Sequence, residues 1–61
     1  MKLQDVLEKL RYADKVTVKD QKGYQLFCGT VNQILYRKEL ADREVDIFYP
    51  EMLHGLVVKL E

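Results

Sequence analysis

The sequence contains few of the residues on which catalytic and metal sites most often depend. Among its 61 residues it has one cysteine (Cys28), one histidine (His54), one proline (Pro50) and no tryptophan. A single cysteine excludes an internal disulfide framework, and one cysteine with one histidine falls short of a structural zinc site. The three glycines are isolated from one another. A phosphate-binding glycine loop is therefore excluded as well.

Long apolar runs and net charge are also missing. No apolar run approaches the roughly 20 residues of a membrane-spanning helix. The chain opens at Met1 directly into an amphipathic pattern rather than a signal-peptide core, so we expect a cytoplasmic protein with no membrane partner. The formal net charge is +0 at pH 7, and no overall positive field favours nucleic acid.

The charges are nevertheless unevenly placed along the chain. Residues 1–38 carry eight basic and four acidic side chains, a balance of +4, whereas residues 39–61 carry two and six, a balance of −4. Two interpretations stay open. The halves attract each other within the fold, or they form a bipolar surface that recruits a charged partner.

No catalytic set is apparent in the residues that remain. Cys28 with His54 would form a nucleophile and base only if the fold brought them together, and Cys28 is expected on a core face, where a thiol is inert. Asp42, Glu44 and Asp46 are spaced as on a solvated acidic edge rather than as an acid/base pair. We predict a protein without enzymatic activity, cofactor, metal or small-molecule substrate.

The length predicts one domain over residues 1–61. A chain of this size buries only about 60% of the surface that its unfolded form exposes. Its apolar content of 48% is that of a globular protein. The core must therefore be efficient, or it must be shared with another subunit.

Hydrophobic periodicity predicts two short helices. One, over about 2–12, has an apolar stripe at i, i+3, i+4 and i+7: Leu3, Val6, Leu7 and Leu10. The second, over about 30–37, begins where Thr30 and Gln33 have the spacing of a capping box. The stretch 37–43 is charged and lacks a period, which indicates a loop.

Four segments have the alternation of β-strands: 15–19, 24–28, 44–49 and 56–60. Asp20–Gly23 predicts a tight turn between the first two, and Gly29 and Pro50 are expected to end the second and third. The residues expected to face the core are Val16, Val18, Leu26, Cys28, Val45, Ile47, Tyr49, Leu56, Val58 and Leu60.

The resulting order α-β-β-α-β-β favours a two-layer α+β domain. We expect one four-stranded antiparallel sheet with two short helices against one face. A small, strongly curved barrel-like sheet plugged by a helix is the alternative. The order of the strands stays open, because two hairpins can join in more than one way.

An open sheet would leave an apolar patch on its other face, formed by Phe27, Phe48 and Val57. Monomers seldom leave such a patch uncovered. Either the second helix or the 37–43 loop crosses to that side, or two chains pack there as a homodimer, which would also enlarge the core. These three residues are our candidate protein interface.

A second candidate surface is basic. Arg11, Lys15, Lys19 and Lys22 cluster around the first strand and could hold a phosphate backbone, with Tyr24 or Phe27 as a stacking platform. The alternative interpretation needs no ligand, because lysines on an edge strand deter edge-to-edge aggregation.

Five short segments together resemble a group of uncharacterised small proteins from prophages and mobile elements of Gram-positive bacteria. They are Val16–Asp20, Gly23–Leu26, Gly29–Val31, Leu40–Val45 and Leu56–Val58, of which Arg43-Glu44-Val45 is the most distinctive part. The resemblance implies an accessory protein and assigns no site residue. Taken with the missing catalytic set, it leads us to expect a non-enzymatic protein that binds another protein, with nucleic-acid binding as the alternative.

Overall fold

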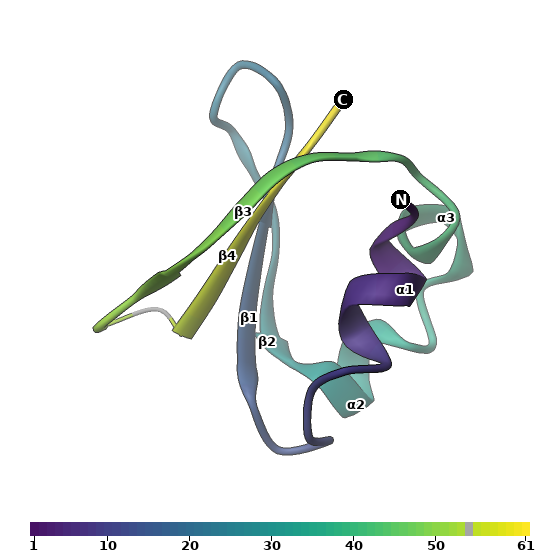
Figure 1. The fold of residues 1–61 in the computed structure, drawn as a ribbon, viewed down its shortest axis with the longest axis vertical. Coiled ribbons are helices and arrows are strands. Elements are labelled where there is room, and N and C mark those ends of the chain that lie inside the picture. The colour runs from purple at the N-terminus through teal and green to yellow at the C-terminus, as the bar shows by residue number, and fades with distance from the viewer. Residues whose placement is uncertain (54) are drawn as a thin grey trace.

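The computed structural model describes residues 1–53 and 55–61 and shows a two-layer α+β fold (Figure 1). One layer is a four-stranded sheet of β1 (Lys15–Lys19), β2 (Gln25–Thr30), β3 (Val45–Glu51) and β4 (Gly55–Leu60). The other consists of three short helices, α1 (Leu3–Leu7), α2 (Val31–Ile34) and α3 (Lys38–Ala41), all on the same side of the sheet. The predicted α+β class is confirmed. The predicted position of His54 in a turn lies outside the described residues.

The sheet is mixed, and our expectation of a purely antiparallel sheet was wrong. Its order is β2-β1-β4-β3, in which β1 and β4 pair in parallel and each pairs antiparallel with its hairpin partner. The cause lies in residues 31–44, which return the chain across one face of the sheet through α2 and α3. Strand β3 therefore starts at the same end as β2, and the two inner strands run in the same direction.

The helices differ in detail from the predicted ones. The first ends at Leu7, earlier than expected. Beyond it the backbone N–H groups of Lys9 and Leu10 donate hydrogen bonds to carbonyls only three residues before them, rather than four. The capping box of the second helix is confirmed: Gln33 N donates to Thr30 Oγ1 at 3.4 Å, and Thr30 N donates to Gln33 Oε1 at 3.1 Å.

The stretch 37–43, predicted as a loop, contains the third helix. Its single turn begins where the Arg37 carbonyl accepts hydrogen bonds from the N–H groups of Leu40 and Ala41. Both of these side chains are buried. A helix of one turn needs only such a pair of apolar residues, too few to produce a period in the sequence.

The core lies between the sheet and the helices. It contains the following buried residues: Leu3, Val6, Leu7, Val16, Val18, Val31, Ile34, Leu40, Val58 and Leu60. The predicted core faces of β1 and β4 are thus confirmed. We call the other side of the sheet, which no helix covers, the uncovered face. Thr17 and Val57 pair there and are buried, although no helix lies over them.

Strand β3 continues through Pro50 instead of ending there. Glu61 N donates to Glu44 O at 3.1 Å, so the odd-numbered residues of β4 direct their N–H groups toward β3. Their register partners in β3 include Tyr49, whose backbone groups therefore face β4. The backbone groups of Phe48 and Pro50, which alternate with Tyr49, are directed away from β4. A proline is tolerated there, since its nitrogen faces outward from an edge strand.

Gly55 supports a first prediction about stability. It adopts φ +70°, and a Cβ built there would lie 2.5 Å from the carbonyl oxygen of Lys15, where β1 and β4 begin side by side. We expect Gly55→Ala to lower the free energy of unfolding by about 2 kcal/mol or more, from backbone strain and this clash. Gly23→Ala is the matched control, because Gly23 has φ +91° with no atom within 4 Å of the added Cβ. It should cost only about 1 kcal/mol. Urea unfolding measures both, and equal losses would contradict the close approach of the two strands.

Candidate interaction surface

Among the described residues, large exposed apolar side chains gather on the hairpin of β3 and β4. We call five of them the hairpin surface: Ile47, Phe48, Tyr49, Met52 and Leu53. The first three are 52%, 46% and 41% exposed, and the two in the turn are 102% and 83% exposed. Several large apolar side chains exposed close together along one hairpin are typical of a contact surface.

Exposed apolar side chains lie on both sides of β3. Tyr49 is the register partner of Val57, which pairs with Thr17, so Tyr49 and its alternate Ile47 lie on the uncovered face. Phe48 is the partner of Val58 and lies on the helix side. Our expectation that Ile47 and Tyr49 face the core and Phe48 faces away from it was therefore wrong, because the register of β3 and β4 shifts between Val45 and Ile47 and reverses the alternation beyond it. Strand β3 is at the edge of the sheet, so no further strand lies beside Ile47, Phe48 or Tyr49 on its outer side.

The three residues of the predicted interface do not form one patch. Phe27 is the register partner of Val18, so it faces the helix layer and is half-buried against the core. Val57 is on the uncovered face but only 1% exposed. Phe48 alone is accessible. The alternation in the sequence assigned Phe27 to the wrong face because the register of β1 and β2 shifts between Val18 and Lys19.

The same shift places Cys28 outside the core. Its register partner is Thr17, so it lies on the uncovered face, where it is exposed and accepts a hydrogen bond from Thr17 Oγ1 at 3.7 Å. Our expectation of a buried cysteine was therefore wrong. Leu26, assigned to the same face as Cys28, is half-buried against the core.

Two of the predicted nucleic-acid contacts share the uncovered face. Lys15 and Lys19 alternate with the core residues of β1, so both lie on this side with Thr17. Lys59 is the register partner of Lys19 across the parallel pair and adds a third lysine that we did not predict. The pattern of β4 does put Lys59 opposite its core residues, but the strand order was needed to place it beside Lys19.

The other two predicted contacts lie off the sheet. Arg11 is exposed in the connection before β1, and its backbone N–H donates to Asp14 Oδ2 at 2.9 Å. Lys22 is exposed in the turn between β1 and β2. Within residues 1–53 and 55–61, no ion pair involves Arg11, Lys15, Lys19, Lys22 or Lys59.

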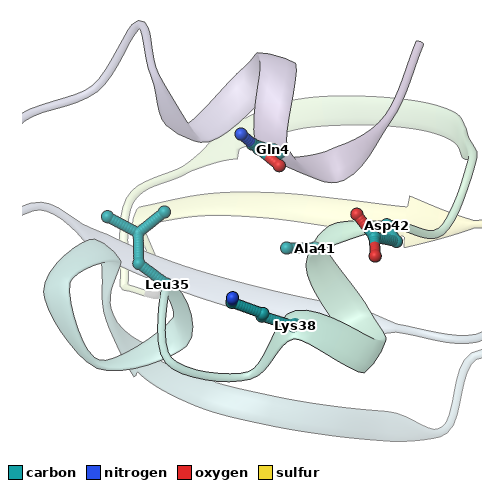
Figure 2. A pocket seen from close by; sticks show the side chains of 5 residues that line it. All are labelled: Gln4, Leu35, Lys38, Ala41 and Asp42. Carbon is teal, nitrogen blue, oxygen red and sulfur yellow. The ribbon is translucent and has the colours of Figure 1, made fainter.

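A cavity of about 380 Å³ lies between α1 and the segment of α2 and α3. Figure 2 shows Gln4 on one side of it and Leu35, Lys38, Ala41 and Asp42 on the other. These side chains include no cysteine, histidine or hydroxyl group that could act as a nucleophile. In the part of the chain that the structure describes, no group of three His, Cys, Asp or Glu residues could hold a metal ion.

Two exposed ion pairs shift the pKa of one member each. A hydrogen bond with Glu44, at 3.0 Å, raises the pKa of the Met1 amino group above its usual 8.0. A hydrogen bond from Arg37 lowers the pKa of Glu39 below its usual 4.5. The first pair connects the residues before α1 to the residue before β3, and the second lies at the start of α3, so both have a structural role. The acidic group predicted around Asp42, Glu44 and Asp46 thus has Glu44 occupied by the Met1 amino group.

Comparison of the chain with protein-family models, curated proteins and solved structures finds no match. Among the described residues, no helix has the length and apolar character needed to cross a membrane.

The position of Cys28 generates a second prediction. In the folded protein its thiol should react with a disulfide reagent such as Ellman's reagent at the rate of an ordinary accessible thiol, because it is exposed on the uncovered face. The folded protein should release one equivalent of thionitrobenzoate per chain, measured by its absorbance. Circular dichroism checks that the protein stays folded during the reaction. Release that requires denaturant would contradict the observed register of β1 and β2.

Proposed function

We propose that this chain is a small non-enzymatic binding protein that acts through protein–protein contact made by the hairpin surface. The observation that carries the proposal is the exposure of five large apolar side chains on one hairpin of a chain with 61 residues. Keeping this area in water is unfavourable, at roughly 25 cal/mol for each Å² that a partner could cover. A partner protein that covers the hairpin removes this cost.

The resemblance to prophage and mobile-element proteins supplies a setting for this proposal. In that setting the chain is an accessory protein in the bacterial cytoplasm, which modulates a partner without chemistry of its own.

A third prediction tests the hairpin surface. Tagged wild-type protein is exposed to a bacterial lysate supplemented with the untagged chain, and retained proteins are quantified by mass spectrometry. The amount of protein retained by the variant Ile47→Ser/Leu53→Ser should be at least about tenfold lower than the amount retained by the wild type. The reason is that hot-spot residues of an interface commonly contribute more than about 1.4 kcal/mol each.

The matched control is Tyr24→Ser/Tyr36→Ser, which removes two large exposed side chains elsewhere on the molecule, at 69% and 82% exposure. It should retain the same proteins as the wild type. Circular dichroism must show that both variants are folded. Equal retention by all three proteins would contradict the proposal.

The uncovered face favours a second candidate function, binding of a nucleic-acid backbone. Lys19 and Lys59 are register neighbours, and Lys15 lies on the same face. No ion pair in the described ranges neutralises these lysines. Tyr49, which is on this face too, is available for base stacking.

A fourth prediction separates this candidate from the first. If the lysines contact phosphates, a fluorescent single-stranded oligonucleotide should bind at low salt and dissociate as salt rises. Lys19→Gln/Lys59→Gln should lower the slope of log K against log salt by about 1.4, since each phosphate contact on a single strand contributes about 0.7. Lys9→Gln, on the exposed side of the segment after α1, is the control and should leave the slope unchanged. Anisotropy that stays flat at low ionic strength would eliminate this function.

A further inference from the structure

The distribution of apolar side chains on β3 restricts the way in which a partner can bind. Ile47 and Tyr49 are exposed on the uncovered face, and Phe48 is exposed on the helix side. A partner that lies flat on one face of the sheet would cover only one of these groups. A strand that pairs with the edge places side chains on both faces and covers both.

The backbone of β3 is available for such pairing over a short window. The N–H and C=O of Phe48 are directed away from β4, as the alternation from the Glu61–Glu44 hydrogen bond requires. The start of the strand is already occupied, because Val45 N donates to Met1 O at 2.8 Å and Leu3 N donates to Arg43 O at 2.9 Å. The free window is therefore 46–50, and its middle residue is Phe48.

We propose that a second copy of this chain occupies the edge, with β3 pairing antiparallel to β3 of the other copy about a twofold axis at Phe48. This inference rests on the proposed function and names the partner of the same surface. The pairing joins two four-stranded sheets into one of eight strands. It also answers the problem of a small core, because apolar side chains that are exposed in one chain are covered in two.

The side chains of the window are self-complementary in this register. Phe48 lies opposite Phe48 of the second copy on the helix side, and Ile47 lies opposite Tyr49 on the uncovered face, twice by symmetry. Aromatic and β-branched cross-strand pairs of this kind stabilise a sheet by about 0.2–1 kcal/mol each. Asp46 lies opposite Pro50, so no two acidic side chains oppose each other.

Neighbouring registers lose this match. A twofold axis at Ile47 places Phe48 opposite the carboxylate of Asp46. An axis at Tyr49 places Ile47 opposite the carboxylate of Glu51. Only the axis at Phe48 puts all three exposed apolar residues of the strand opposite apolar residues.

Stacking of two uncovered faces is a poorer arrangement for a second copy. Lys15, Lys19 and Lys59 lie on that face without carboxylate partners among the described residues. Two copies stacked there would bring six ammonium groups together, and like charges oppose association. The edge contact extends over only five residues of one strand, whereas a stable interface covers roughly 800 Å² per partner. The dimer should therefore dissociate on dilution.

A fifth prediction tests the register by cysteine crosslinking in a Cys28→Ser background. In Phe48→Cys the two thiols would lie on the axis, with Cα atoms about 5.5 Å apart, within the range that a disulfide bridges. Mild oxidation should convert most of the protein to a covalent dimer of twice 7.2 kDa. Asp46→Cys is the control on the same exposed strand, because the two cysteines would be roughly 14 Å apart and should not crosslink.

Phe48→Cys also removes an aromatic contact, so the wild-type chain is measured in parallel by light scattering over a dilution series. A mass that rises toward two chains at high concentration, together with selective crosslinking at position 48, supports the inference. A single-chain mass at every concentration, crosslinking at 46 equal to that at 48, or a dimer that fails to crosslink at 48 each overturns it. The proposed function is tested separately: it survives if the Ile47→Ser/Leu53→Ser variant loses a different protein from the lysate, and it fails if retention does not depend on the hairpin.

Discussion

The parallel pairing of β1 with β4 is the contact on which the rest of the structure depends. It joins the first strand of the chain to the last, and it makes both of them inner strands whose valines are buried. It also determines which strands are left at the edges, namely β2 and β3. The exposed hairpin and the neighbouring position of Lys19 and Lys59 are both consequences of this one pairing, although they lie on different parts of the surface.

Local patterns predicted the local parts of the fold well. The alternation at Val16 and Val18, the capping box at Thr30 and Gln33 and the core face of β4 are confirmed, because each depends on residues close in the sequence. The parallel pairing could not be predicted in this way. It depends on the path of residues 31–44 across the sheet, and the single turn of α3 within that path leaves no periodic signal.

The candidate surface was predicted only in part for a related reason. Phe48 is exposed, but both Phe27 and Phe48 lie on the opposite face from the one predicted, because the register is irregular beside Lys19 and again between Val45 and Ile47. The alternation of residues in the sequence does not reveal such bulges. Met52 and Leu53 were treated as turn residues, although their size and apolar character were the available signal of a contact surface. Lys59 had the correct face in the sequence pattern, yet its neighbour across the sheet came only from the strand order.

Pro50 gives the exposed edge a property that its apolar side chains alone would not have. Indefinite stacking of chains into a fibril needs a strand that can both donate and accept at every outward position. The outward nitrogen of Pro50 cannot donate, and the register of β3 with β4 is irregular between Val45 and Ile47. The edge can therefore form only a short ladder of backbone hydrogen bonds. The ladder is limited at one end by the proline and at the other by the N-terminal residues, which already pair with the start of the strand. A chain can in this way expose an apolar edge strand and still be protected against continued edge-to-edge aggregation.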